Sequence, residues 1–357
     1  MKHSPSIRKL NPIVIFIAGI LLTPNVIAGN KGVAYVSNQD GGVTVIDLET
    51  MEAKAEMDIG AKGPRGIGVT VDGKWLVTAN KDDSNISIVD ISGVAAPKLI
   101  NIGKNPEFVR ILGDRAFVTY EPSSSGGPPV QKTADAAKDD DDDEEKIPGH
   151  IAIVDLKQGK VIKDIVGKPE TEGLEFTKNG KKMIVTNESD NSITIHDIKS
   201  GKLLKSISVG KYGERPRGIK VSPDGKTYLV TLELSDKILV LNEKFKVVKE
   251  VITGKTPYGV SFDREGKRIF VAANKEKALQ VFDAKTYEKI KDIPTGERCW
   301  HFSFTPDDQQ IMLVCGKSNE VVVIDANKLE VTKRIAGKGM PWGIVTYPKS
   351  MGSIDRP

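Results

Sequence analysis

Short apolar segments alternate with polar turns along the whole chain after about residue 30. Seven of these segments share one pattern, in which two or three apolar residues precede a small or polar residue and, in most copies, Asn. They are Tyr35–Asn38, Leu76–Asn80, Phe117–Tyr120, Ile184–Asn187, Leu229–Leu232, Phe270–Asn274 and Leu313–Gly316. A polar turn and a second apolar run follow each segment, and helical periodicity is absent, so we expect every element to be a strand.

The second apolar runs end in an acidic or amide residue and set the period of the repeat. These ends are Asp47, Asp90, Asp155, Asp197, Asn242, Asp283 and Asp325, which are 43, 65, 42, 45, 41 and 42 residues apart. A period of about 40–45 residues is typical of the four-stranded blade of a β-propeller. The pattern therefore predicts an all-β protein with seven blades, one of which carries an insertion.

A third signature, Pro-x-Gly followed by a tight turn, orders the strands within a repeat. Pro64–Gly66 leads to Asp72-Gly73, and Pro216–Gly218 leads to Asp224-Gly225. Asp-Gly between alternating runs is a strong hairpin signal. We name the four strands of a blade A to D, with A opening at Pro-x-Gly. The mature chain starts at a B strand and ends on an A strand. We therefore expect its last A strand to join its first B, C and D strands and close the ring.

The N-terminus has the layout of a secretory signal. Lys2, Arg8 and Lys9 precede the apolar stretch Ile13–Leu22, and small residues follow at Val26–Ala28. Ten apolar residues are too few to span a bilayer. We interpret residues 1–28 as a signal peptide and 29–357 as one propeller domain in the periplasm, with no membrane span after cleavage. A retained anchor helix is the alternative.

The long interval is an insertion, residues 121–148, between strands B and C of blade 2. It is rich in Ser, Gly and Pro and ends in the acidic run Asp139–Glu145. Such a composition cannot bury a core, so we expect a disordered loop over the channel mouth. A simple solvated loop, a cover for the channel, and a weak attraction for a basic partner or calcium are the alternatives.

These repeats resemble the YVTN family of β-propeller repeats, which Phe117–Tyr120 and Ile184–Asn187 approximate. The chain is also similar to exported YVTN propellers associated with PQQ (quinoprotein)-dependent alcohol catabolism, through Cys299–His301 and Pro341–Gly343. The resemblance implies a binding or scaffold role, accessory to a redox or transport system, rather than catalysis.

The strand order also predicts which residues meet at the channel mouth. The second position of each A strand is occupied, from blade 1 to blade 7, by Arg65, Glu107, Glu172, Arg217, Tyr258, Trp300 and Trp342. The three aromatic residues form an arc opposite a charged arc, which is the form of a ligand site. The alternatives are that the rings only pack between inner strands, and that Arg65 and Arg217 pair with Glu107 and Glu172 instead of an anionic ligand.

His301 and the two cysteines are further candidates on blade 6. His301 follows Trp300, and with His150 beside the insertion it permits a haem-binding redox propeller, although a packed histidine is the commoner outcome. Cys299 and Cys315 flank one hairpin and face each other across it, so we consider a disulfide and two buried thiols.

Charge and missing motifs narrow the function classes. The net charge of +4 is scattered, so we expect no nucleic acid as a partner. Gly68–Lys74 has the spacing of a phosphate loop, but Trp75 replaces its Ser or Thr. We therefore expect a monomeric binding propeller without a resident cofactor or metal, whose ligand is a periplasmic protein or a small anionic or aromatic molecule. A lactonase-like hydrolase using Glu107, Glu172 and His301, or a haem protein, is the alternative.

Overall fold

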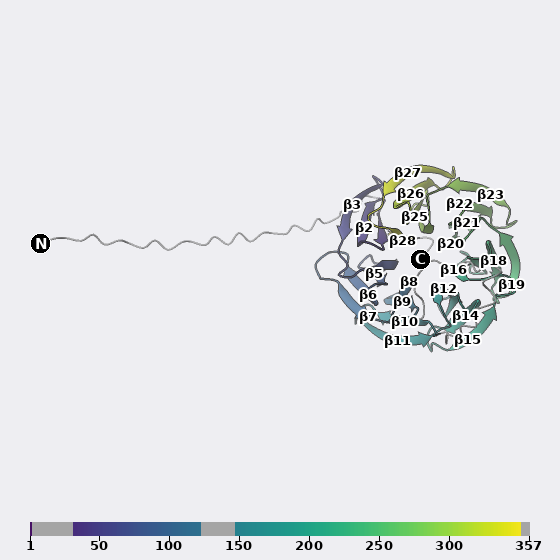
Figure 1. Cartoon of the computed structure of the whole chain (residues 1–357), viewed down its shortest axis with the longest axis horizontal. Coiled ribbons are helices and arrows are strands. Elements are labelled where there is room, and N and C mark those ends of the chain that lie inside the picture. The colour runs from purple at the N-terminus through teal and green to yellow at the C-terminus, as the bar shows by residue number, and fades with distance from the viewer. Residues whose placement is uncertain (2–30, 123–146, 351–357) are drawn as a thin grey trace, which may run out of the picture.

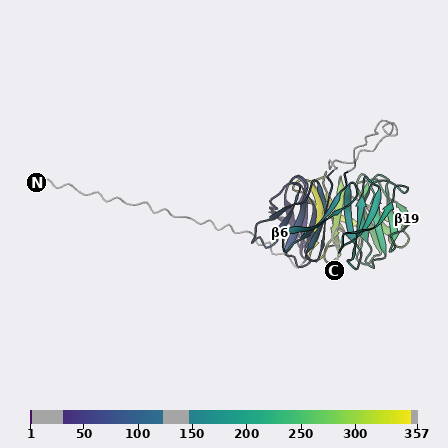
Figure 2. The ribbon, with the colours of Figure 1, turned by 90° about the horizontal axis from the view of Figure 1, so that it is seen from below.

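The computed structural model describes residue 1 and residues 31–122 and 147–350. These residues form a ring of seven four-stranded antiparallel sheets around a central channel, the blades of a β-propeller (Figure 1). Seen edge-on, the ring is a short, wide disc (Figure 2). The predicted fold class is confirmed, and the described residues contain no helix. The proposed signal peptide and most of the insertion lie outside the described residues.

Each blade has its strands in the order A, B, C, D from the channel outward. The A strands of blades 1 to 7 are β4 (Pro64–Val69), β8 (Pro106–Leu112), β12 (Thr171–Phe176), β16 (Pro216–Val221), β20 (Pro257–Phe262), β24 (Cys299–Phe304) and β28 (Pro341–Tyr347). The B strands are β5 (Trp75–Asn80), β9 (Arg115–Tyr120), β13 (Lys182–Asn187), β17 (Thr227–Leu232), β21 (Arg268–Ala273), β25 (Gln310–Cys315) and β1 (Val33–Asn38).

The C and D strands form the outer half of each blade. The C strands are β6 (Asn85–Asp90), β10 (His150–Asp155), β14 (Ser192–Asp197), β18 (Lys237–Asn242), β22 (Ala278–Asp283), β26 (Glu320–Asp325) and β2 (Val43–Asp47). The D strands are β7 (Lys98–Asn101), β11 (Lys160–Val166), β15 (Leu203–Ser208), β19 (Val247–Ile252), β23 (Lys289–Pro294), β27 (Glu330–Ala336) and β3 (Glu52–Met57).

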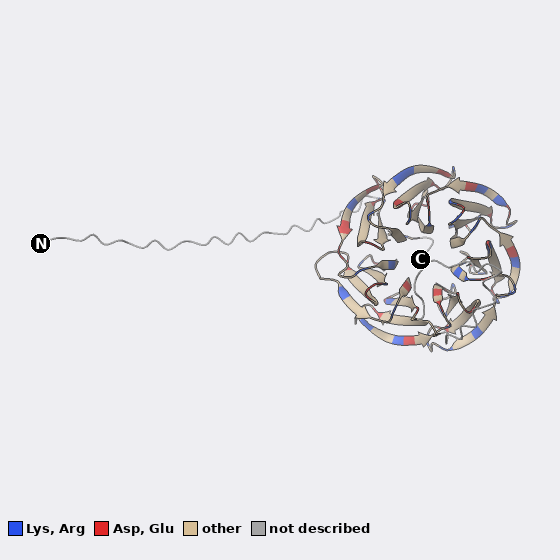
Figure 3. Cartoon of the chain, in the orientation of Figure 1, with Lys and Arg blue, Asp and Glu red and all other residues tan. Residues whose placement is uncertain are grey.

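Burial follows position in the blade. The B strands are almost wholly buried, because neighbouring blades cover both of their faces, and this explains their near-continuous apolar sequences. The D strands are largely exposed and carry interspersed charges of both signs around the rim (Figure 3). Charged side chains on an exposed edge strand discourage pairing with another molecule. The core is therefore a set of layers between blades.

The ends of the described chain close the ring as the repeat pattern predicts. Strand β28 pairs antiparallel with β1, with Tyr347 opposite Val33 and Val345 opposite Tyr35. Blade 7 thus combines the last strand with the first three. None of the described residues forms a helix with the length and apolar character needed to cross a membrane.

Candidate functional site

The seven A strands enter the channel in the same way. The residue directly before each A strand has a left-handed backbone, with φ between 47° and 69°. These residues are Gly63, Asn105, Glu170, Arg215, Thr256, Arg298 and Met340. Because the turn is shared, the second residue of each A strand occupies an equivalent place near one mouth of the channel. The structure therefore places the seven residues singled out from the sequence on one ring of positions.

Hydroxyl groups of the repeat motif hold this ring of positions between blades. Thr186 donates a hydrogen bond of 2.7 Å to the carbonyl oxygen of Arg217, on the next blade, and Thr231 donates one of 2.9 Å to that of Tyr258. Thr119 does the same to Glu172 at 2.8 Å. The third residue of the YVTN-like segment thus fixes the backbone of the mouth residue on the following blade.

The glycine of Pro-x-Gly has a packing reason on the same strands. A Cβ atom on Gly218 would lie 2.2 Å from the carbonyl oxygen of Tyr258, and one on Gly259 would lie 2.4 Å from that of Trp300. Backbone atoms cannot give way easily, so only glycine lets successive A strands approach this closely. The glycine of the Pro-x-Gly signature is therefore required by the close packing of the A strands around the narrow channel.

The charged half of the mouth is a buried network of ion pairs. Arg65 pairs with Glu107, and Arg217 pairs with Glu172 at 2.9 Å. Figure 3 shows charge colours on the inner strands of blades 1 to 4, whereas β20, β24 and β28 are tan. The two arginines therefore pair with the two glutamates, as the alternative of internal ion pairs expects.

Four further glutamates belong to this network and were not among the candidates from the sequence, and one of them is Glu170, which pairs with Arg215 at 3.1 Å. Glu188 lies 2.7 Å and Glu233 lies 3.1 Å from the Arg217 guanidinium, and Arg215 pairs with both glutamates. Glu121 is 4% exposed and its carboxylate lies beside those of Glu107 and Glu172. The expectation that the whole segment 121–148 is disordered is thus wrong at its first residue.

A signal for these residues is present in the sequence. The residue after each B strand lies at the same mouth as the start of each A strand, because the chain reverses on that side both before each A strand and after each B strand. From blade 1 to blade 7 this position holds Lys81, Glu121, Glu188, Glu233, Asn274, Gly316 and Gln39. Three consecutive glutamates on blades 2 to 4 would have marked the site.

Burial shifts the protonation of the glutamates in this network. It raises the pKa of Glu172 to about 7, against the opposing effect of the Arg217 charge. Desolvation also raises the pKa of Glu121 and that of Glu188 well above the usual value, and neighbouring carboxylates add to the rise for both. Carboxylates this close cannot all remain ionised without added positive charge.

The aromatic half of the mouth is packed rather than open. Tyr258 and Trp342 are each 3% exposed, and their ring centroids lie 6.5 Å apart. Trp300 is also buried and lies under the Arg298 guanidinium, with 5.4 Å between the guanidinium carbon and the ring centroid. The rings therefore fill the space between inner strands, as the packing alternative expects.

His301 lies among these rings. Its ring centroid is 4.5 Å from that of Trp342, 5.2 Å from that of Tyr258 and 5.5 Å from that of Phe108. Its Nε2 atom is buried without a hydrogen-bond partner. Desolvation, reinforced by the Arg217 and Arg110 charges, lowers the pKa of His301 to about 3. The side chain is therefore neutral across the physiological range.

The space beside His301 is small. It measures about 30 Å³ and is lined by His301, Glu172, Arg217 and Tyr258 among others, which is about the volume of one water molecule. This cavity cannot admit a haem. His150 is occupied elsewhere, since its Nδ1 atom lies 2.7 Å from a carboxylate oxygen of Asp164 and its ring stacks on Tyr120. The described residues therefore do not bring together the pair of histidines on which haem binding was considered.

A larger recess opens on the same face over blades 4 to 6. Its volume is about 420 Å³. Its lining carries four basic side chains, and Glu233 and Glu297 are the acidic ones. The basic residues are Lys275, Lys277, Arg298 and Lys317. Because Glu233 is already paired with Arg217, the free charge of the recess is positive.

The two cysteines on blade 6 are bonded to each other. Cys299 and Cys315 are directly opposite in the A–B hairpin, and a disulfide joins them. Cys315 replaces the threonine of the motif, so on this blade a covalent link within the hairpin stands where blades 2 to 4 have a hydrogen bond to the next blade.

Comparisons with known proteins extend only as far as the fold. No protein-family model matches this sequence, and no curated protein matches it. Similar solved structures include hydrazine synthase of Kuenenia stuttgartiensis, with 19% identity, a TM-score of 0.68 and coverage of 83% of this chain and 93% of that one. The periplasmic gluconolactonase PpgL of Pseudomonas aeruginosa has 14% identity, a TM-score of 0.69 and coverage of 88% and 98%. The dihydro-haem d1 dehydrogenase NirN has 16% identity, a TM-score of 0.64 and coverage of 90% and 76%. At these identities the likeness establishes the propeller architecture alone.

Proposed function

We propose that this chain is an exported binding propeller that takes up a small anionic molecule in the recess over blades 4 to 6. The observation that carries the proposal is the recess itself, a hollow of about 420 Å³ lined by Lys275, Lys277, Arg298 and Lys317. Concave surfaces of this size with a few converging polar groups are the usual form of small-molecule sites.

Arg298 is the residue on which recognition depends. No described residue forms an ion pair with its guanidinium group, which rests on the ring of Trp300. An unpaired guanidinium presents a rigid fork of donors that fits a carboxylate or a phosphate. Trp300, identified from the sequence as part of the ligand site, would then contribute by holding the side chain of Arg298 in place beneath the ligand.

The lysines add positive charge without full neutralisation. Lys277 and Lys317 share a single carboxylate, that of Glu297, at 2.6 Å and 3.1 Å. Lys275 is exposed at the rim. Two lysines on one carboxylate leave an excess positive charge, which attracts an anion over a distance of about one Debye length.

Export to the periplasm is part of the same proposal. The layout of residues 1–28 supports it, and the disulfide between Cys299 and Cys315 is stable in an oxidising compartment. Membership of the YVTN repeat family and service to a quinoprotein-dependent or other redox or transport system are supported by the resemblance of the motifs.

The test is calorimetric titration of the purified chain with 6-phosphogluconate, gluconate and inorganic phosphate. We expect 6-phosphogluconate to bind most tightly, because it carries both a carboxylate and a phosphate. Arg298→Gln should weaken binding at least tenfold. Arg334→Gln is the matched control, because Arg334 is on the exposed strand β27 and pairs with Glu320. No binding by any of the three anions, or equal binding by R298Q and the native chain, would refute the proposal.

A second candidate function, lactone hydrolysis, is favoured by one observation. Glu172 and His301 line the same water-sized cavity as Arg217, so a carboxylate, a cation and a space for water occur together. The fold is also that of the gluconolactonase PpgL. Hydrolysis of gluconolactone above the spontaneous rate, lost in Glu172→Gln with an unchanged circular dichroism spectrum, would support it. A rate that Glu172→Gln leaves unchanged would dismiss it.

A further inference from the structure

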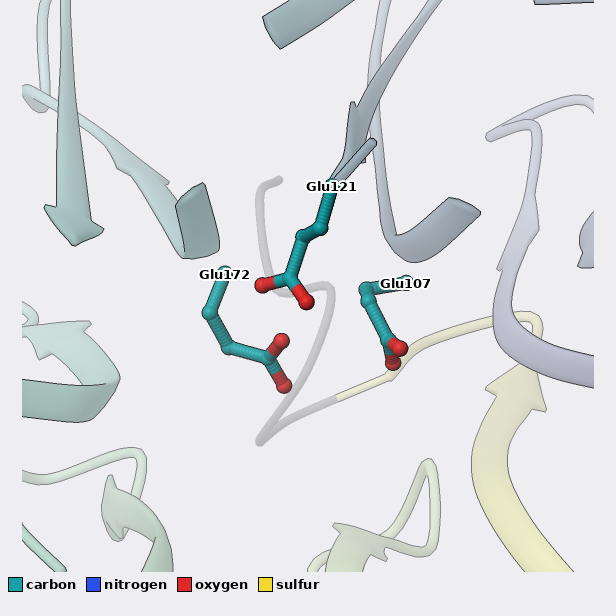
Figure 4. Close-up of side chains that lie close together, drawn as sticks. All are labelled: Glu107, Glu121 and Glu172. Carbon is teal, nitrogen blue, oxygen red and sulfur yellow. The ribbon is translucent and has the colours of Figure 1, made fainter. Parts of the chain in front are cut away.

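Three carboxylates converge at the inner ends of blades 2 and 3. Glu107 is the second residue of β8, Glu121 directly follows β9, and Glu172 is the second residue of β12. One carboxylate oxygen from each lies within 4.8 Å of those of the other two. Figure 4 shows the three side chains pointing toward one another from separate segments of the chain.

Two oxygens of this cluster have no hydrogen-bond partner. Oε1 of Glu121 and Oε2 of Glu107 are buried and unsatisfied, and the two residues are 4% and 1% exposed. No lysine or arginine among the described residues pairs with Glu121, whereas Glu107 and Glu172 each have one. An unsatisfied buried carboxylate is costly, so a ligand that completes its coordination would be stabilising.

The charges of the whole network point the same way. Six glutamates belong to its described part, against three arginines: Glu107, Glu121, Glu172, Glu170, Glu188 and Glu233 against Arg65, Arg215 and Arg217. If all are ionised, the network has an excess of three negative charges. A divalent cation would remove two of them, and a single shared proton would remove the third.

We propose that Glu107, Glu121 and Glu172 bind a divalent cation, preferably Ca²⁺, between blades 2 and 3. All the donors are carboxylate oxygens, which suit hard cations and not zinc, which favours nitrogen and sulfur. Ca²⁺ binds oxygen at about 2.3–2.6 Å, so opposite ligands lie about 4.6–5.2 Å apart. Mg²⁺ demands a near-ideal octahedron and keeps several of its own waters, which a buried group of protein carboxylates does not favour. The ion would bridge strands from two blades, and the site is separate from the basic recess and does not depend on the function proposed for it.

The experiment is calorimetric titration of the full mature chain with Ca²⁺, after removal of bound metal with a chelator, together with thermal unfolding. We expect one Ca²⁺ per chain and a Tm that rises with Ca²⁺. Glu121→Gln should weaken the affinity at least tenfold and abolish the shift in Tm. Gln resembles the protonated form of Glu121, so we expect this variant to fold. Glu330→Gln, on the exposed strand β27, is the matched control and should behave like the native chain.

A second variant separates this site from the acidic run in the insertion. In it, Asp139 to Asp143 are replaced by Asn, and we expect the stoichiometric Ca²⁺ site to be retained. Should Glu121→Gln fail to fold, this variant decides the question, because binding that disappears with the acidic run would overturn the proposal. It is also overturned if the native chain binds no Ca²⁺, or if Glu121→Gln binds it as tightly as the native chain.

Discussion

His301 couples the stability of the ring to pH. The side chain is 8% exposed, lies among three aromatic rings, and faces the Arg217 and Arg110 charges. Its pKa is lowered from 6.5 to about 3 in the folded chain. Because the folded pKa is depressed, the unfolded chain takes up a proton that the folded chain refuses. The stabilisation is therefore complete above pH 6.5 and is lost as pH falls from there toward 3.

The size of this pH dependence follows from the uptake of one proton by His301 in the unfolded chain. Each pH unit within this window removes about 1.4 kcal/mol, so the contribution falls by about 2 kcal/mol between pH 7.5 and pH 5. His301→Gln removes the titrating group and leaves the nearby carboxylates in place. The free energy of unfolding of the native chain minus that of H301Q should then fall by about 2 kcal/mol over this range.

The assay is urea unfolding of both proteins at several pH values, followed by tryptophan fluorescence. Taking the difference between the two proteins removes the effect of other titrating groups, which both share. His196→Gln is the comparison, because burial also lowers the pKa of His196 but no arginine contributes, so its slope should be shallower or confined to a narrower range. A difference that stays constant from about pH 7.5 to about pH 5 would refute the assignment of a buried neutral imidazole.

Three further predictions concern the framework of the mouth. Thr186→Val removes the hydrogen bond to the Arg217 carbonyl and should lower the free energy of unfolding by about 1 kcal/mol, measured by urea unfolding; a native value would contradict the role of the hydroxyl. The double variant Cys299→Ala, Cys315→Ala removes a link between residues 16 apart and should lower the free energy of unfolding by about 3 kcal/mol. The intact mass of the native chain should lie two hydrogens below that of the reduced chain, and equal masses would contradict the disulfide. Trp342→Ala empties a buried site and should cost about 3–5 kcal/mol, seen as a lower Tm; an unchanged Tm would mean that the ring does not pack as described.

The sequence was sufficient to predict the fold because all seven blades have the same four-stranded arrangement, so the same pattern of buried positions recurs seven times along the chain. Each apolar B strand is covered on both faces, and each Pro-x-Gly marks a close approach of two inner strands, so both patterns recur with the period of a blade. The second position of each A strand follows from the same register. The prediction of these seven mouth residues therefore needed only the order of the strands.

The state of the mouth residues was harder to predict, because it depends on distances between blades. Nothing in the sequence states that Arg217 faces three glutamates, or that Trp342 packs against His301. Glu121 was misjudged because the composition of residues 122–148 was extended to the residue before them. Its burial depends on its own neighbours in space, whereas composition describes an average over a segment.

The pairing of β28 with β1 has a consequence for how the chain folds. The first sheet to be synthesised is completed by the last strand, so until that strand arrives the ring is an open arc and the inner edge of β1 is unpaired. Such an edge can pair with a strand of another chain. The interval between the synthesis of residue 33 and that of residue 347 is therefore a period in which the open ring is exposed to aggregation. Under the proposed export, in which the chain crosses a membrane unfolded, the same delay is an advantage, because the ring cannot close before the C-terminal strand has followed.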